Sequence, residues 1–191
     1  MMWAMVAGWL AWGRGDDGEG RLKGVWWLGV ATGLKWVTAP LLVWAAWSRV
    51  RAKDWAAAGW LMAVGVAPVA LGLAWFHFDF ERVGPLAPEN YVAWARTGEL
   101  GPWLLELAWP ESASRNGMVL AVFVPVAAGI FFRTKTMTGF AETFLFALLV
   151  ASPSVHAWYF VWLVPLAVAT RNRGTMLVSV SAFVYFWLWE T

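Results

Sequence analysis

Long apolar runs alternate with short polar segments along this chain. The runs cover residues 1–12, 24–34, 37–48, 55–76, 116–132, 138–151, 157–170 and 174–189. Because a helix rises about 1.5 Å per residue, the run 55–76 can cross a hydrocarbon core of about 30 Å, whereas runs of about twelve residues cannot. The pattern predicts an all-α fold: a polytopic transmembrane helical bundle of about seven to eight membrane helices that includes short hairpin pairs.

Polar residues interrupt the apolar pattern at two places. The first is Lys35 with the nearby Pro40, and the second is the segment Ser152–Ala157, which contains His156. Backbone that turns at membrane depth is tolerated where protein buries it or where it lines a cavity, and an ionisable group there is a functional candidate. We expect Ser152 and Ser154 to cap helix 157–170 or to satisfy the turn.

Composition supports a membrane protein. The chain is 61% hydrophobic and 14% charged, whereas a soluble domain is about 45–50% apolar and about 25% charged. The net charge of +2 is too small to indicate a nucleic-acid partner, and the absence of cysteine excludes disulfides and thiolate metal sites. No glycine-rich phosphate loop and no zinc-ligand spacing occur, so we expect neither a cofactor nor a metal.

Lysine and arginine set the expected orientation, since cytoplasmic loops carry an excess of them. Short basic loops that should face the cytoplasm lie at residues 49–53, 133–135 and 171–173. The 77–115 loop, which we expect to carry interfacial amphipathic helices, and the Ser152–Ala157 turn then lie outside. Residues 24–48 form either one span, with the Gly-rich polar loop 13–23 outside, or two short helices meeting at Lys35, with that loop inside. We favour the hairpin, because it places more basic residues inside and because Pro40 weakens a continuous helix.

Two local patterns resemble a known family. One is Gly29-Val-Ala-Thr-Gly-Leu-Lys35 followed by Thr38-Ala-Pro40 and a basic loop, and the other is Ser152-Pro-Ser-Val-His-Ala-Trp-Tyr-Phe-Val-Trp-Leu-Val-Pro165. In their order and spacing they resemble the C-terminal half of the GT-C superfamily of polytopic glycosyltransferases, specifically the bacterial polyprenyl-phosphate-sugar-dependent mannosyltransferases. The resemblance spans about residues 13–170.

The resemblance implies transfer of a sugar, mannose or another hexose, from a polyprenyl-phosphate donor to a glycan or lipid acceptor on the external face of a bacterial inner membrane. The family's acidic catalytic residue lies in an external loop after its first transmembrane helix, a segment without a counterpart here. We therefore expect residues 1–191 to form a single membrane-embedded domain, the C-terminal part of a longer protein, that transfers no sugar when expressed alone.

Candidate substrate-binding residues gather at the expected external face. The Lys35 ammonium can pair with a lipid-linked phosphate, or it can simply reach headgroups as a snorkelling lysine. His156 can donate a hydrogen bond to phosphate or sugar, or can bond to the backbone of its turn. Trp158 and Tyr159 can pack on a sugar ring or a polyprenyl chain, or can serve as interfacial anchors.

The 77–115 loop adds further candidates. Arg82 and Arg96 can contact an anionic donor or acceptor. His77, Asp79 and Glu81 alternate and would share one face of a strand, which weakly suggests a cation site; a charged interfacial loop is the simpler interpretation. Two other functions remain open for the whole chain: a transporter or flippase for a lipid-linked substrate, and a non-catalytic membrane subunit or truncated remnant.

Overall fold

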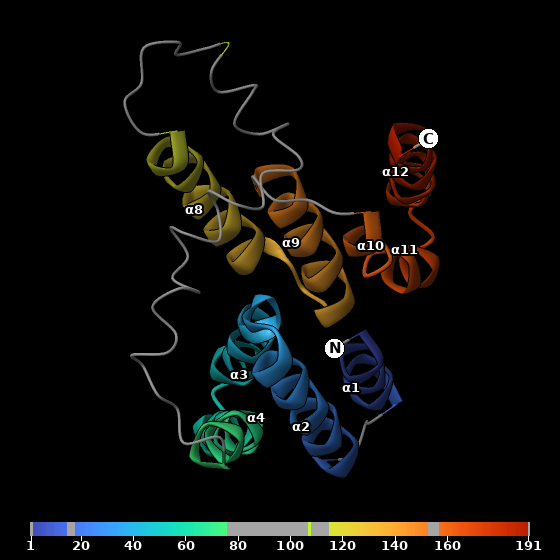
Figure 1. Cartoon of the computed structure of the whole chain (residues 1–191). Helices are drawn as coiled ribbons and strands as arrows, with labels where there is room; N and C mark the ends of the chain where they lie inside the picture. The colour runs from blue at the N-terminus through green and yellow to red at the C-terminus, as the bar shows by residue number, and fades with distance from the viewer. Residues whose placement is uncertain (1, 15–17, 76–106, 108–114, 153–156, 191) are drawn as a thin grey trace. The chain divides into compact units, whose positions relative to one another are not determined.

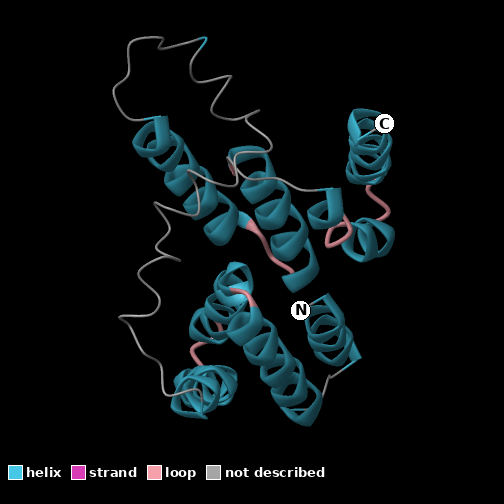
Figure 2. Ribbon diagram, viewed as in Figure 1, coloured by secondary structure: helices cyan, strands magenta, loops and turns pink. Residues whose placement is uncertain are grey.

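The computed structural model of the chain describes residues 2–14, 18–75, 107, 115–152 and 157–190. The described part is helical and contains no strand, as Figure 2 shows. The predicted all-α class is therefore confirmed. The chain divides into two compact units, Met1–Asp79 and Phe80–Thr191. That they form one membrane-embedded domain remains a prediction.

Helix α2 is the centre of the first unit and packs on α1, α3 and α4. The elements are α1 (Met2–Arg14), α2 (Gly18–Leu34), the short 3-10 helix η1 (Trp36–Thr38), α3 (Ala39–Arg51) and α4 (Trp55–Trp75). Buried side chains on α2 and α3, such as Val25, Leu28 and Leu41, form the core. In Figure 1, α4 is seen nearly end-on, and α2, which packs on it, lies across the view.

Glycines let the backbones of the first unit approach closely. A methyl group placed on Gly8 of α1 would lie 2.8 Å from the carbonyl oxygen of Gly24 on α2. One placed on Gly29 of α2 would overlap the carbonyl oxygen of Gly65 on α4, and one on Gly65 would lie 2.9 Å from Cδ2 of Leu42 on α3. Small residues at such crossings let helices pack backbone to backbone.

The predicted polar loop 13–23 is wrong over its second half, because α2 already begins at Gly18. Local interactions explain the longer helix. Glu19 lies in the first turn, where the helix dipole favours an acid, and its Oε1 is 2.6 Å from Nζ of Lys23 one turn later. The Arg21 guanidinium also lies 6.0 Å from the centre of the Trp12 ring on α1.

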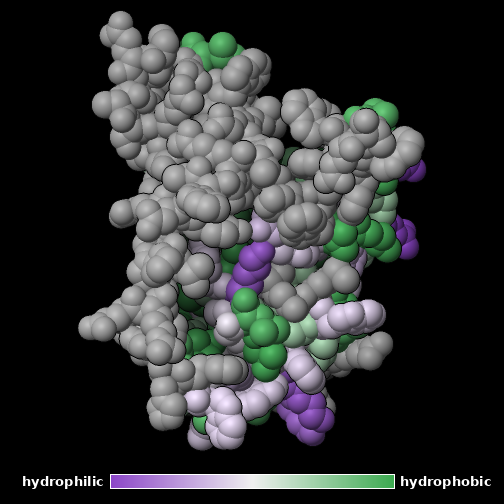
Figure 3. All heavy atoms as spheres, in the orientation of Figure 1, coloured by the Kyte–Doolittle hydropathy of each residue, from purple (hydrophilic) through white to green (hydrophobic). Residues whose placement is uncertain are grey.

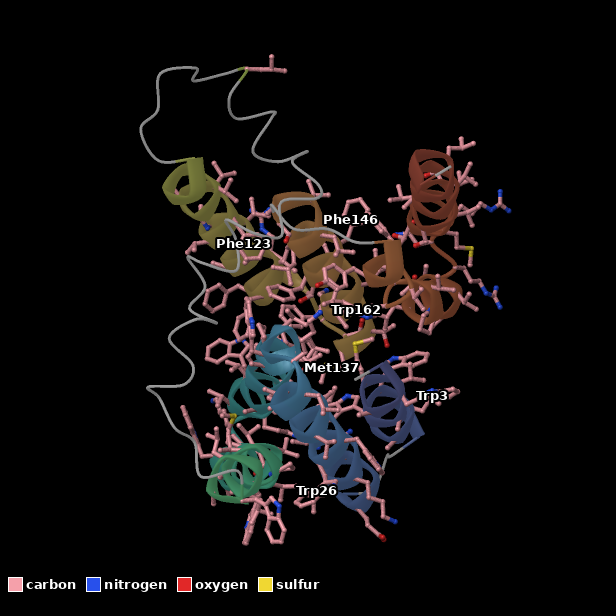
Figure 4. All side chains as sticks on the ribbon, in the orientation of Figure 1. Trp3, Trp26, Phe123, Met137, Phe146 and Trp162 are labelled. Carbon is pink, nitrogen blue, oxygen red and sulfur yellow. The ribbon has the colours of Figure 1, made fainter. Side chains whose placement is uncertain are left out.

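Aromatic side chains join α8 and α9 in the second unit. Its elements are α8 (Arg115–Arg133), α9 (Met137–Ala151), α10 (Ala157–Phe160), α11 (Val164–Thr170) and α12 (Arg173–Glu190). Phe140 of α9 meets Phe131 of α8 edge to face at 5.7 Å, and Phe144 lies 6.0 Å from Phe123, which Figure 4 labels on α8. α11 packs on α9, and α12 packs on α10 and α11.

The run 157–170 was expected to be one helix, but it is interrupted at residues 161–163. Pro165 supplies the reason, since it has no N–H to donate to the carbonyl of Val161 one turn earlier. Within the interruption, the N–H of Trp162 bonds to the carbonyl of Tyr159, and the N–H of Leu163 bonds to the carbonyl of Phe160. Each of these bonds spans three residues instead of the four of an α-helix. Ser152 ends α9, with its N–H bonded to the Leu148 carbonyl. Its expected role in the following turn remains a prediction.

Within the described residues, α4 is the one helix that is both long and apolar enough to cross a membrane. The apolar segments Ala121–Arg133 and Met137–Ala151 are shorter than a full span. A single such helix is weak evidence by itself, since the buried core helix of a soluble protein can have the same length and composition. The predicted 77–115 loop lies outside the described residues, apart from Leu107 and Arg115.

Candidate functional site

The chain leaves helical geometry at Lys35, as the sequence predicted. α2 ends at Leu34, and Lys35 itself is extended, with φ −159° and ψ 115°. Its N–H still bonds to the carbonyl of Ala31 at 2.8 Å, the last bond of α2. After the single turn of η1, α3 begins with Pro40 in its first turn, where proline is tolerated because that N–H has no partner inside the helix. The predicted helix break at Lys35 is confirmed, while the membrane hairpin with Lys35 outside remains a prediction.

Two threonine hydroxyls hold this break in shape. Thr38 is fully buried, and its Oγ1 lies 3.0 Å from Oγ1 of Thr32 in the last turns of α2. Thr32 Oγ1 also donates to the Leu28 carbonyl at 2.8 Å, while Thr38 Oγ1 is 3.3 Å from the Lys35 carbonyl. Each hydroxyl has one hydrogen to donate. The shortest bonds form when the Thr38 hydroxyl donates to Thr32 Oγ1 and the Thr32 hydroxyl donates to the Leu28 carbonyl. This chain ties η1 to α2 and fixes the backbone on which Lys35 sits.

Apolar side chains flank the lysine. Leu34 is 64% exposed and Trp36 is 72% exposed, whereas Lys35 is half-buried. A basic residue between an exposed leucine and an exposed tryptophan suits a membrane–water interface, where the apolar groups enter the hydrocarbon and the ammonium meets anionic headgroups. The same arrangement suits a phosphate carried on a lipid.

The second predicted stretch is partly described. Tyr159 is buried on α10, and its ring lies 4.6 Å from that of Trp162, which is buried in the following turn. The Tyr159 side chain is thus packed within its own unit. Trp158 belongs to α10, but its side chain lies outside the described residues, as does all of His156.

The remaining candidates are not placed. Arg82 and Arg96 lie outside the described residues, and so do His77, Asp79 and Glu81. Lys35 belongs to the first unit and Tyr159 to the second, so the expected convergence of these residues at one external site remains a prediction.

Sequence reasoning missed Glu142. This carboxylate lies on α9, is 5% exposed, and its Oε1 has no hydrogen-bond partner in the described part of the chain. A signal was available in the sequence, because Glu142 is the one charged residue in the apolar run Met137–Ala151. A charge inside such a run is a functional candidate for the same reason that Lys35 is.

Comparison with known proteins adds no relative: no family model, curated protein or solved structure matches the chain.

Proposed function

We propose that this chain is a membrane-embedded protein that binds a polyprenyl-phosphate-linked sugar at the external face and takes part in transfer of the hexose to a glycan or lipid acceptor. The observation that carries the proposal is the Lys35 break, in which an extended lysine lies between two apolar helices and is flanked by exposed Leu34 and Trp36. The GT-C-like motifs of the sequence supply the substrate class.

The dimensions of α4 support the membrane setting. Its 21 residues give a length of about 31 Å, close to the roughly 30 Å of a hydrocarbon core. Trp55 at its start and Trp75 at its end are 69% and 81% exposed, in the positions of the two aromatic belts. The basic residues Arg49, Arg51 and Lys53 precede it, so we assign this end to the cytoplasm.

Exposed apolar residues on other helices support further membrane segments. Leu177, Val180 and Leu188 of α12 and Val122 and Val124 of α8 are each about half exposed or more. Figure 3 shows such residues, in green, at the surface of the face in view. Soluble monomers rarely expose large contiguous apolar areas, whereas acyl chains cover them without cost. These surfaces support the proposal of further membrane helices, about seven to eight in all. The bacterial inner membrane is proposed from the GT-C resemblance alone.

Lys35 is the residue to which we assign the donor phosphate, because a lysine is a point charge that binds phosphate without a fixed geometry. His156, Trp158, Tyr159, Arg82 and Arg96 remain proposed contacts to the donor or acceptor. No residue is assigned as the base that deprotonates the acceptor.

A specific observation also favours the transport alternative. Among the described residues, each unit contains an interrupted helical segment, at residues 35–38 in the first unit and at residues 161–163 in the second. Paired discontinuous helices occur around the substrate sites of transporters. A flippase for the same lipid-linked sugar would need the same phosphate contact at Lys35.

Donor affinity tests the assignment of Lys35. The wild-type protein, Lys35→Ala and Lys35→Arg are placed in nanodiscs, and binding of a radiolabelled polyprenyl-phosphate mannose is measured. Loss of a phosphate contact of about 1.5–3 kcal/mol should weaken binding by about tenfold or more in Lys35→Ala, while Lys35→Arg retains most of the affinity because the charge remains.

Lys135→Ala is the matched control, since Lys135 is an exposed lysine in the short segment between α8 and α9. It should bind the donor as wild type does. Equal affinity of wild type and Lys35→Ala would remove Lys35 from the site, and equal weakening by Lys135→Ala would reduce the effect to general membrane charge.

A further inference from the structure

Residues 49–54 form a basic turn between α3 and α4. Arg49 and Arg51 lie in the last turn of α3, and Lys53 follows the helix. Arg51 and Lys53 are exposed, and Arg49 is half-buried. Asp54 is the one acid in this segment, so the basic turn carries a net positive charge.

The carbonyl groups at the end of α3 do not need these cations. The N–H of Lys53 bonds to the Val50 carbonyl at 2.9 Å, and the N–H of Asp54 bonds to the Arg49 carbonyl at 3.0 Å. Basic side chains near a helix end otherwise bond to such carbonyls. Lys53 also has φ 61°, a left-handed conformation in which a side chain is strained and glycine is not. Because strained residues gather at functional sites, this lysine is a candidate for a binding role.

The other charged groups of the turn favour an anion. The Arg51 guanidinium lies 5.5 Å from the centre of the buried Trp44 ring. Stacking uses the face of a guanidinium and phosphate is bound through the N–H groups at its edge, so the two contacts are compatible. Oδ1 of Asp54 accepts a hydrogen bond from the N–H of Ala57 at 3.1 Å, so this carboxylate caps α4. The positive end of the α4 dipole therefore offsets part of its charge.

Apolar surface continues from the basic turn along α4. Trp55 at the start of the helix is 69% exposed, and Trp60 is 67% exposed. Between them, a methyl group placed on Gly59 would meet no atom within 4 Å, so this side of α4 is open. An acyl chain can lie on such a surface while its headgroup meets the cations, and an indole ring suits the level between the two.

We propose that the basic turn binds the phosphodiester headgroup of an anionic phospholipid in the cytoplasmic leaflet. Arg51 and Lys53 are its charged contacts, and the acyl chains lie on the exposed side of α4. A phosphate free in solution would gain the charge contacts alone, whereas a lipid also gains the apolar surface beside Trp55. The inference rests on the membrane setting of the proposed function and does not depend on the sugar donor.

Native mass spectrometry of the full chain released from detergent micelles tests the site. The probes are dioleoyl-phosphatidylglycerol and, at the same concentrations, dioleoyl-phosphatidylcholine, which has the same acyl chains and no net charge. A basic residue near an anionic lipid surface contributes about fivefold in affinity. Arg51→Gln and Lys53→Gln should therefore each weaken phosphatidylglycerol binding about fivefold, and the double variant about 25-fold. The wild type should bind phosphatidylcholine about 25-fold more weakly than phosphatidylglycerol.

Lys135→Gln is the matched control, because Lys135 is an exposed lysine in the short segment between α8 and α9. It should bind phosphatidylglycerol as the wild type does. Asp54→Asn keeps a helix cap and removes the negative charge, so it should tighten the binding, and it decides the matter if the double variant does not fold. Equal binding of the two lipids, equal weakening by Lys135→Gln, no tightening in Asp54→Asn, or displacement of phosphatidylglycerol by an equal concentration of glycerol phosphate would each overturn the proposal.

Donor binding separates this inference from the proposed function. Lys35 precedes α3 and the basic turn follows it, so Arg51→Gln and Lys53→Gln should bind polyprenyl-phosphate mannose as the wild type does. A wild type that binds the donor through Lys35 but does not distinguish the two phospholipids would overturn the lipid site alone. Equal donor affinity of wild type and Lys35→Ala, with phosphatidylglycerol selectivity intact, would overturn the donor assignment alone.

Discussion

The two units pack helices of similar apolar composition in different ways. In the first unit, α2 meets α1 at Gly8 and Gly24 and meets α4 at Gly29 and Gly65, with backbone against backbone. In the second unit, phenylalanines fill the space between α8 and α9, and Phe140 is 1% exposed between Phe131 and Phe144.

The difference shows what each interface can tolerate. In the membrane setting that we propose, apolar burial gives little drive for helix association, so the fit of the surfaces decides whether helices associate. Helices that meet at glycines pack closely only if no side-chain atoms are added at the contact. Helices that meet through aromatic rings pack well only if no ring is removed. The first unit should therefore fail when atoms are added and the second when atoms are removed.

Removing the Phe140 ring should produce the largest loss. Phe140→Ala deletes a ring that contacts both Phe131 and Phe144, and a buried Phe→Ala change typically costs about 3–5 kcal/mol because it leaves a cavity. The free energy of unfolding, measured by denaturant titration in detergent, should fall by that amount.

Phe132→Ala is the control within the same region, since the Phe132 side chain is 61% exposed although its ring also meets Phe131. It should cost less than about 1 kcal/mol. Equal losses for the two variants would show that the α8–α9 seam does not hold the second unit together.

Adding one methyl group should damage the first unit by a smaller amount. In Gly29→Ala the new methyl overlaps the Gly65 carbonyl, which belongs to the backbone and cannot rotate away, so α2 and α4 must separate. Overpacking of this kind costs about 1–3 kcal/mol. Chemical denaturation gives the value, and a tryptophan emission change would report the altered helix contact.

Gly59→Ala on α4 should stabilise the protein, whereas Gly29→Ala should destabilise it. A methyl at Gly59 meets nothing within 4 Å, so the change should stabilise the helix by about 0.5–1 kcal/mol through propensity alone. Stabilisation by Gly29→Ala as well would mean that α2 and α4 are not in close contact.

Much of the helical pattern could be predicted from the sequence, because apolar runs bounded by charges are a direct signal. The run 138–151 corresponds to α9 and the run 55–76 to α4. The pattern failed where local interactions override polarity. Gly18–Lys23 is polar and glycine-rich, yet the Glu19–Lys23 pair and the dipole-favoured position of Glu19 keep it helical.

The candidate site was harder to predict. Lys35 was found because a charge, a proline and a helix break coincide there. Glu142 was missed because it is a single charged position inside an unbroken helix. Its burial, and the absence of a hydrogen-bond partner for its Oε1 among the described residues, are three-dimensional properties. The break at Val161 could have been found from Pro165, had the missing N–H been considered.

One device is common to both units. α3 and α11 each end in a Schellman motif whose left-handed residue is basic, Lys53 with φ 61° and Arg171 with φ 56°. In the first, the N–H of Asp54 bonds to the Arg49 carbonyl, and in the second, the N–H of Asn172 bonds to the Ala167 carbonyl. Glycine is the usual residue at this position, since a side chain is strained there.

The smallest expected effect is a rise in the free energy of unfolding when the left-handed residue of either unit is replaced by glycine. Lys53→Gly and Arg171→Gly relieve the left-handed strain of about 1–2 kcal/mol, but glycine also makes the unfolded chain more flexible, which costs about 0.4–1 kcal/mol. Each variant should gain up to about 1.5 kcal/mol of unfolding free energy. Lys53→Ala and Arg171→Ala keep the strain and remove the charge, so they should stay within about 0.5 kcal/mol of the wild type. Similar gains at the two positions would show that the units share their helix ends and differ in their interfaces. If one glycine variant is stabilised and the other is destabilised, the two units differ in their helix C-caps as well as in their helix packing.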